Sequence, residues 1–249
     1  LNIKRVYFLD EVHRSYNPKG SFLANLNESD PNAIKIGLTG TPLLGTDYNS
    51  KALFGGYIHK YYYNSSIADG YTLRLIREEI ETNYKLTLKQ ALEEIEILKG
   101  NADKKIVYAH PKFVEPMLDY IVQDFEKARI SMNDNSIGGL VVCDSSDQAK
   151  MLFEIFESKY AINKNVHSGL LQAAEPQESY GDKKKAESKV TKAAVILHDI
   201  GTKQDRKDQV EAFKDGHIDF LFVYNMLLTG FDAPRLKKLY IGRVIKAHN

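Results

Sequence analysis

Apolar runs of strand length alternate along this chain with longer segments in which apolar residues recur every three or four positions. The helical pattern is clearest in residues 111–129, where Val114, Leu118 and Phe125 fall on one face. Strands separated by helix-sized segments pair in parallel, so the pattern predicts an α/β protein built on parallel sheets. The predicted strands are residues 3–9, 33–38, 71–80, 138–143, 218–223 and 238–242, with a short strand piece at 165–168. The predicted helices are residues 21–28, 87–99, 111–129, 147–160 and 205–214, with one helical turn at 65–70.

Two adjacent carboxylates stand at the end of the first predicted strand. Asp10 and Glu11 follow the apolar run, and His13 comes two positions later. Open α/β sheets bind ligands at the carboxyl ends of their strands. There Asp10 can hold a Mg²⁺ ion on the phosphates of a nucleotide, because Mg²⁺ prefers oxygen ligands and keeps several waters. Glu11 can orient and deprotonate an attacking water. The alternative is that both carboxylates simply open a solvated loop.

The second predicted strand ends in a turn rich in hydroxyl groups, Thr39-Gly40-Thr41-Pro42. Gly40 permits a tight backbone and Pro42 ends strand pairing. Both hydroxyls can face a ligand at the strand tip, although an ordinary turn has the same composition. Residues 45–84, which follow, are rich in tyrosine and glycine. Tyrosine rings can stack on bases, but beside β-branched residues they more often pack on a sheet, and we favour sheet packing.

The composition suits one or two globular domains with real cores, since 43% of the 249 residues are hydrophobic and 27% are charged. With a net charge of +1, any DNA-binding surface must be a local patch. The single cysteine, Cys143, excludes an internal disulfide, suits a reducing compartment and is expected in the core. No apolar run reaches the ~20 residues that cross a bilayer, and no signal peptide is apparent, so no membrane contact is predicted. The chain does not begin with Met, and we expect it to be a fragment of a larger protein.

Taken in order, four short motifs resemble those of the motor in superfamily-2 helicases and translocases. Residues 10–13, Asp-Glu-Val-His, resemble the DExH box, motif II, and residues 38–42 resemble motif III. Residues 140–146 lie where motif IV opens the second domain of that motor, and residues 228–234, Leu-Thr-Gly-Phe-Asp-Ala-Pro, resemble motif V. The order of the motifs and their domain-scale spacing argue against coincidence.

Three longer stretches are similar to one branch of that superfamily, the restriction (R) subunit of type I restriction-modification enzymes. They are Asp-Glu-Val-His-Arg-Ser at 10–15, Ala-Asp-Gly-Tyr-Thr-Leu at 68–73 and Asn-Met-Leu-Leu-Thr-Gly-Phe-Asp-Ala-Pro at 225–234. Residues 243–249 resemble the lead-in to motif VI of the same family.

The resemblance implies two RecA-like domains of the P-loop NTPase type, the first only partly present, with a helical insertion between them. Residues 1–70 would be the C-terminal part of the first motor domain. Residues 71–136 would form a crossover strand and a helical connecting segment, and residues 137–249 the second motor domain, truncated before motif VI.

The resemblance also implies ATP-dependent translocation of double-stranded DNA, which in that family precedes cleavage by a nuclease domain outside this sequence. Asp10 would hold Mg²⁺, Glu11 would position the lytic water, and His13 would pass the state of the γ-phosphate to motif III. The remaining expected contacts to ATP are Thr39, Thr41, Gly230 and Asp232. The expected DNA contacts, made mainly to phosphates, are Ser145, Ser146, His167, Ser168 and Thr229.

Some of these assignments have structural alternatives. His167 can equally be a hydrogen-bonded structural histidine, and the lysine run 183–185 is more typical of a solvated surface than of a DNA contact. The implied partners are duplex DNA and the methylation (M) and specificity (S) subunits of a type I complex, in the cytoplasm of a prokaryote.

The sequence departs from the family pattern in one important respect. It contains no Gly-Lys dipeptide and therefore no Walker A loop, which in the family precedes the DExH box. With only part of each wall of an ATP site, this sequence by itself is expected not to hydrolyse ATP. Two other functions stay open: another superfamily-2 motor, of DNA repair or remodelling, and a non-catalytic DNA-binding or assembly module.

Overall fold

The computed structural model describes residues 4–15, 21–44, 49–99, 103–161, 190–228 and 230–243. Their contacts divide them into two compact units, a first unit that runs up to Glu78 and a second unit that runs from Glu79 to Ile245. Each unit combines parallel strands with helices, so the predicted α/β class with parallel sheets is confirmed. Within the described ranges, no helix has the length and apolarity that crossing a membrane requires.

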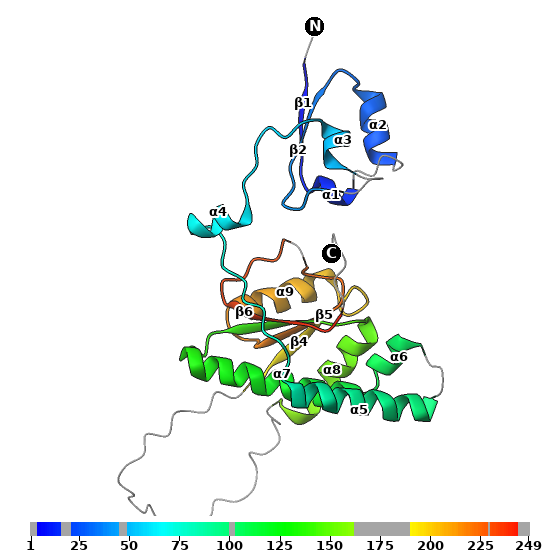
Figure 1. Cartoon of the computed structure of the whole chain (residues 1–249), viewed down its shortest axis with the longest axis vertical. Coiled ribbons are helices and arrows are strands. Elements are labelled where there is room, and N and C mark those ends of the chain that lie inside the picture. The colour runs from blue at the N-terminus through cyan, green and yellow to red at the C-terminus, as the bar shows by residue number, and fades with distance from the viewer. Residues whose placement is uncertain are drawn as a thin grey trace, which may run out of the picture. The chain divides into compact units, whose positions relative to one another are not determined.

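The first unit is built on two parallel strands, β1 (Val6–Leu9) and β2 (Ile34–Gly37). Val6 pairs with Ile34 and Leu9 with Gly37, so both strands end at the same edge. Side chains of β1 alternate between the two faces, with Leu9 buried and Phe8 exposed. The helices of this unit are α1 (Val12–Ser15), α2 (Ser21–Ser29), α3 (Ser50–Phe54) and α4 (Tyr63–Ala68) (Figure 1).

The second unit contains a four-stranded, wholly parallel sheet with the strand order β4-β5-β3-β6. Its strands are β3 (Gly138–Val142), β4 (Ala193–Ile196), β5 (Phe220–Val223) and β6 (Leu236–Ile241). Its helices are α5 (Thr82–Lys99), α6 (Lys104–Tyr108), α7 (Pro111–Met132), α8 (Ser146–Lys159) and α9 (Lys203–Lys214).

Helices cover both faces of this sheet, which is why its central strands are apolar on both sides. Helices α7 and α8 pack on one face, where Phe125 and Phe156 meet Phe220 of β5. Helix α5 lies along α7 in the same layer (Figure 1). Helix α9 covers the opposite face, where Phe213 packs with Leu140 of β3. The result is a three-layered core formed by residues of the second unit.

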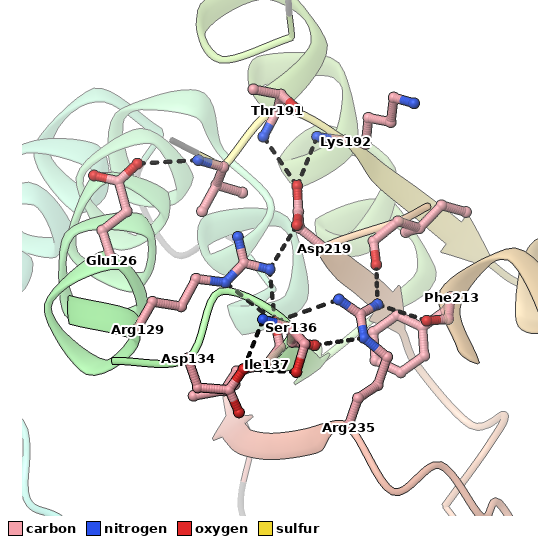
Figure 2. Close-up of polar contacts among 12 residues, drawn as sticks. Glu126, Arg129, Asp134, Ser136, Ile137, Thr191, Lys192, Phe213, Asp219 and Arg235 are labelled. Atoms are coloured by element: carbon pink, nitrogen blue, oxygen red, sulfur yellow. Dashed lines mark hydrogen bonds and ion pairs between the residues drawn. The ribbon is translucent and has the colours of Figure 1, made fainter. Parts of the chain in front are cut away.

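A buried ion pair fastens the amino ends of three strands. Arg129 of α7 donates to Asp219, just before β5, at 2.6 Å, and to the carbonyl oxygen of Ile137, just before β3, at 2.6 Å (Figure 2). The other oxygen of Asp219 accepts the backbone N–H groups of Thr191 and Lys192, which lead into β4. The ion pair and its hydrogen bonds thus link α7 to the segments that lead into β3, β4 and β5.

A second arginine, which directly precedes β6, forms hydrogen bonds in the same region. Arg235 donates to the carbonyl oxygens of Ser136, Phe213 and Ile218, and its guanidinium lies 5.0 Å from the centre of the Phe213 ring (Figure 2). Burial lowers the pKa of Arg235 from its ordinary value. These contacts lie at the amino edge of the sheet, opposite the edge at which parallel α/β sheets bind ligands.

Most predicted elements of the described residues are present, with ends shifted by at most five residues, but two expectations about strands fail. Residues 71–80, predicted as a strand, form no strand. The hydroxyl of Tyr63 instead donates to the carbonyl oxygen of Leu73 and accepts the N–H of Leu75, so a side chain takes up backbone groups that a strand would pair. Strand β4 (Ala193–Ile196) was not predicted. The short strand piece at 165–168 lies outside the described residues.

The expectation that the tyrosines of residues 45–84 pack on a sheet is also wrong for the cluster around α4. Tyr57, Tyr61, Tyr62 and Tyr71 lie outside the strands and are at least 43% exposed. Tyr61 donates instead to Asp69 at 2.6 Å. These rings lack sheet neighbours because the chain around them forms only the short helix α4 and turns.

Candidate functional site

The two motifs at the strand tips of the first unit are joined directly through the backbone. Because β1 and β2 are parallel, Asp10 and Thr39 both follow strands that end at the same edge. The N–H of Leu38 donates to the carbonyl oxygen of Leu9 at 2.8 Å, and the N–H of Val12 donates to Leu38 at 3.2 Å. Val12 is buried and anchors α1 beneath this junction. The segment from Asp10 to His13 is therefore held against the Thr-Gly-Thr-Pro turn.

His13 provides the side-chain link between these motifs. Its Nδ1 lies 2.8 Å from Oγ1 of Thr39, and the side chain is only 6% exposed. Oγ1 of Thr39 also accepts the N–H of Thr41 at 3.0 Å, which fixes the turn. The same Nδ1 lies 3.2 Å from a carboxylate oxygen of Glu11. The structure thus brings together four of the predicted residues, Glu11, His13, Thr39 and Thr41.

The two carboxylates turn toward solvent at the strand tip. Asp10 and Glu11 are both exposed, and one oxygen of Asp10 accepts the N–H of Glu11 at 2.9 Å. Glu11 has a φ of 50°, the left-handed region that residues other than glycine rarely adopt. This conformation turns the chain abruptly from β1 into α1. Strained residues of this kind collect at functional sites.

The exposed carboxylate of Asp10 at this strand tip suits Mg²⁺ that is held jointly with a nucleotide. In the part of the chain that the structure describes, no three His, Cys, Asp or Glu side chains gather closely enough to bind a metal. Mg²⁺ commonly takes one or two carboxylates and completes its shell with water and phosphate oxygens. An exposed carboxylate such as Asp10 is suited to that arrangement.

The predicted residues of the second unit lie in two places. Ser145 caps α8 at the carboxyl end of β3, where its buried hydroxyl accepts the N–H of Gln148 at 3.1 Å. Ser146 begins the helix and is partly exposed. Because the hydroxyl of Ser145 already accepts this hydrogen bond, a ligand here would contact the backbone N–H groups at the helix terminus rather than the Ser145 side chain.

Gly230 and Asp232 lie in the connection between β5 and β6, and both are exposed. Gly230 has a φ of 68°, which favours glycine, and Phe231 between them is anchored against Phe213 with ring centres 6.0 Å apart. His167, Ser168 and Thr229 lie outside the described residues.

Sequence reasoning missed one polar group at the carboxyl edge of the second sheet. Arg243 follows β6, and its guanidinium donates to the side-chain oxygen of Asn225 at 2.8 Å and lies over the ring of Tyr224. The motif resemblance placed Arg243 only in a lead-in segment and Asn225 only in the longer stretch around motif V. No pattern in the sequence signals their contact, because it depends on the order of the strands.

Comparisons with known proteins agree with the motif resemblance. A family model described as SWI2/SNF2 ATPase matches residues 2–106, and one described as type I restriction enzyme subunit R domain 3 matches residues 135–249. The type I restriction enzyme HindI endonuclease subunit of Haemophilus influenzae is 25% identical over 96% of this chain and 24% of its own length. The SsaAORF53P endonuclease subunit of Staphylococcus saprophyticus is 27% identical over 99% of this chain and 28% of its own length.

A third relative, the putative type I restriction enzyme MjaVIIIP endonuclease subunit of Methanocaldococcus jannaschii, is 26% identical over 95% of this chain and 25% of its own length. The chain thus spans about a quarter of the length of the curated relatives it matches. The parallel α/β architecture is consistent with a RecA-like SWI2/SNF2 fragment.

Proposed function

We propose that this chain, a homologue of the endonuclease subunits of type I restriction enzymes, carries motor residues that couple ATP hydrolysis to the movement of double-stranded DNA. The observation that carries the proposal is the contact between His13 and Thr39. It joins the carboxylates at one strand tip to the hydroxyl-rich turn at the next, as an ATP-dependent motor needs in order to transmit a chemical step.

Hydrolysis requires an attacking water and a base to receive its proton. We assign the base to Glu11, whose exposed carboxylate stands at the strand tip. The water oxygen would form a bond to the γ-phosphorus while the bond to the bridging oxygen breaks, so that ADP leaves with that oxygen and Glu11 takes the proton. Asp10 would hold Mg²⁺, which when bound offsets the negative charge of the phosphates.

His13, Thr39 and Thr41 would couple this chemistry to movement. The Nδ1 of His13 lies within reach of both Glu11 and Thr39, so a change in the carboxylate environment can alter the bond to the turn. Thr39 would carry that change to Thr41 through the N–H that its hydroxyl accepts. Opening and closing of two motor domains around ATP would then move duplex DNA without strand separation.

The second unit would supply the remaining contacts. Gly230 and Asp232 would meet the nucleotide, and Ser145 and Ser146 would present helix-terminal N–H groups to DNA phosphates. His167, Ser168 and Thr229 stay predicted DNA contacts. We propose that the complete protein acts in the prokaryotic cytoplasm with M and S subunits, and that the S subunit reads the DNA sequence.

The test is the substitution Glu11→Gln in the complete protein that contains this sequence. Glutamine keeps the size of the side chain but cannot accept the proton, so ATP binding should persist while DNA-stimulated turnover falls roughly 100-fold or more. Glu28→Gln is the matched control, because Glu28 is also an exposed glutamate of the first unit. Unchanged turnover in Glu11→Gln would remove this residue from the mechanism.

Movement along DNA needs its own measurement. The wild-type protein should displace a third strand bound to duplex DNA downstream of its loading site, in a reaction that depends on ATP. ATP hydrolysis without displacement of the third strand would support an ATPase activity but refute translocation along DNA.

A further inference from the structure

Arg243 lies across the carboxyl end of the central strand of the second sheet. Strand β3 separates β5 from β6, yet Arg243, which follows β6, contacts Tyr224 and Asn225, which follow β5. Gly242, next to Arg243, donates its N–H to the carbonyl oxygen of Val142 at the end of β3. The guanidinium is therefore placed over the same strand tip from which α8 begins.

Two contacts hold the guanidinium in one orientation without neutralising it. The side-chain oxygen of Asn225 accepts one N–H at 2.8 Å, and the ring of Tyr224 lies 5.2 Å from the guanidinium carbon. An amide oxygen and an aromatic face both attract a cation, but neither carries a formal charge. Within the described ranges, no carboxylate forms an ion pair with Arg243.

Other arginines of this unit are occupied in ways that Arg243 is not. Arg129 pairs with the carboxylate of Asp219, and Arg235 and Arg206 each donate to three or more backbone carbonyl oxygens. Arg243 uses one of its donor groups on a side-chain amide and keeps its charge at the ligand-binding edge of the sheet. A planar, oriented guanidinium with free donors fits the paired oxygens of a phosphate.

We propose that Arg243 binds a phosphate group at the carboxyl edge of the second sheet, and that Tyr224 and Asn225 hold its guanidinium ready for that contact. The inference rests on the proposed function, which brings two sources of phosphate to this protein. One is the DNA backbone and the other is ATP, and the experiment separates them.

The first measurement is binding of the complete protein to a fluorescein-labelled duplex of arbitrary sequence, followed by anisotropy at several salt concentrations. If the phosphate belongs to DNA, Arg243→Gln weakens binding roughly three- to tenfold near 0.1 M salt and reduces the slope of log affinity against log salt by about one. Lys237→Gln is the matched control, because it removes one positive charge from an exposed residue near the amino end of the same strand, β6.

A second variant distinguishes phosphate binding by Arg243 from a purely structural contact between the segments that follow β5 and β6. Asn225→Asp replaces the amide by a carboxylate of nearly the same shape, so Arg243 stays in place but its charge is neutralised. If Arg243 binds phosphate, Asn225→Asp impairs the same interaction, with DNA or with ATP, about as much as Arg243→Gln does, while the unfolding temperature is kept. If Arg243 only links β5 to β6 structurally, Asn225→Asp changes neither DNA binding nor the KM for ATP, and that result overturns the proposal.

The second measurement is the KM for ATP in DNA-stimulated hydrolysis. If the phosphate belongs to ATP, Arg243→Gln and Asn225→Asp raise this KM and leave the salt dependence of DNA binding unchanged. If Arg243→Gln and Asn225→Asp give the same results as Lys237→Gln in both measurements, the proposal is overturned. A wild-type protein that binds DNA without hydrolysing ATP would refute the proposed function alone, since the anisotropy comparison can still be made.

Discussion

Thr39 uses a single hydroxyl group both to hold the turn that contains it and to contact His13. Thr39→Val keeps the shape of the side chain and removes both contacts, whereas Thr39→Ser keeps the hydroxyl. A hydrogen bond contributes about 0.5–1.5 kcal/mol, so in the complete protein we expect Thr39→Val to lower kcat for DNA-stimulated hydrolysis roughly three- to tenfold. Steady-state kinetics should show little change in the KM for ATP and near-normal rates for Thr39→Ser. Equal losses in both variants, or a change confined to KM, would contradict a coupling role.

The sequence predicted which strand tips form this site better than it predicted the conformations and contacts of individual residues. Parallel pairing of two strands was sufficient to place Asp10 and Thr39 at one edge, because the carboxyl ends of parallel strands lie together. The left-handed backbone of Glu11 and the contact between Arg243 and Asn225 could not be predicted. Both depend on how the folded chain turns and on which strands become neighbours, and neither has a signature in local composition.

Helix α9 begins with a capping box, which makes its stability sensitive to pH. Thr202 accepts the N–H of Asp205, and the Asp205 carboxylate accepts the N–H of Thr202. The backbone and side chain of Thr202 lower the pKa of Asp205 below its ordinary value of 3.8. Because the folded-state pKa is lowered, this stabilisation is present above the unfolded pKa and is lost as pH falls through the folded-state pKa.

We therefore expect Asp205→Asn to lower the unfolding temperature at neutral pH and to have little effect in strong acid. Thermal unfolding of both proteins from neutral pH to below pH ~3 would check this, since ordinary aspartate pKa values lie near 4. Asp208→Asn on the same helix is the control, because Asp208 is exposed and lies outside the capping box. A difference between wild type and Asp205→Asn that stays constant with pH would exclude this origin.

Asp219 links helix α7 to the segments that lead into β4 and β5, so its removal should destabilise the second unit. Asp219→Ala leaves the guanidinium of Arg129 buried without its carboxylate and frees two backbone N–H groups that lead into β4. Loss of one partner of a buried pair commonly costs about 3–5 kcal/mol. Urea unfolding should show a fall of that order for Asp219→Ala and a much smaller one for Asp208→Ala. Equal stability of both variants would refute the structural role assigned to the pair.

Long helices were predicted more reliably than short elements, since the short helices α1, α3 and α6 and the strand β4 were not predicted. Helix α7 runs from Pro111 to Met132 because its apolar positions follow one face, and that signal is long enough to read directly. Strand β4 has only four residues, and the polar segment before it obscured its short apolar run. Residues 71–80 have a strand-like composition, but the hydroxyl of Tyr63 bonds the backbone of Leu73 and Leu75. Composition indicates which conformation a segment prefers, whereas strand pairing depends on the groups that surround the segment in the folded chain.

The two units differ in how completely they bury their own apolar surface. In the first unit, Val6 and Phe8 of β1 and Ile34 of β2 lie on one face of a two-stranded sheet, and each is at least 47% exposed. In the second unit, β3 and β5 are buried along their whole length by helices on both faces. A sheet with both faces covered has the layered core on which independent folding depends, so the second unit should fold without the first.

Cys143 offers a direct measure of that independence. It is fully buried at the end of β3, and burial raises the pKa of its thiol, so the reactive thiolate is scarce while the second unit is folded. The chain has one cysteine, so labelling by DTNB reports the opening of this unit alone. A shortened chain of residues 79–249 should show the same slow labelling as the 249-residue chain, and fast labelling of both in urea. Rapid labelling of the shortened chain without urea would show that the second unit needs the first.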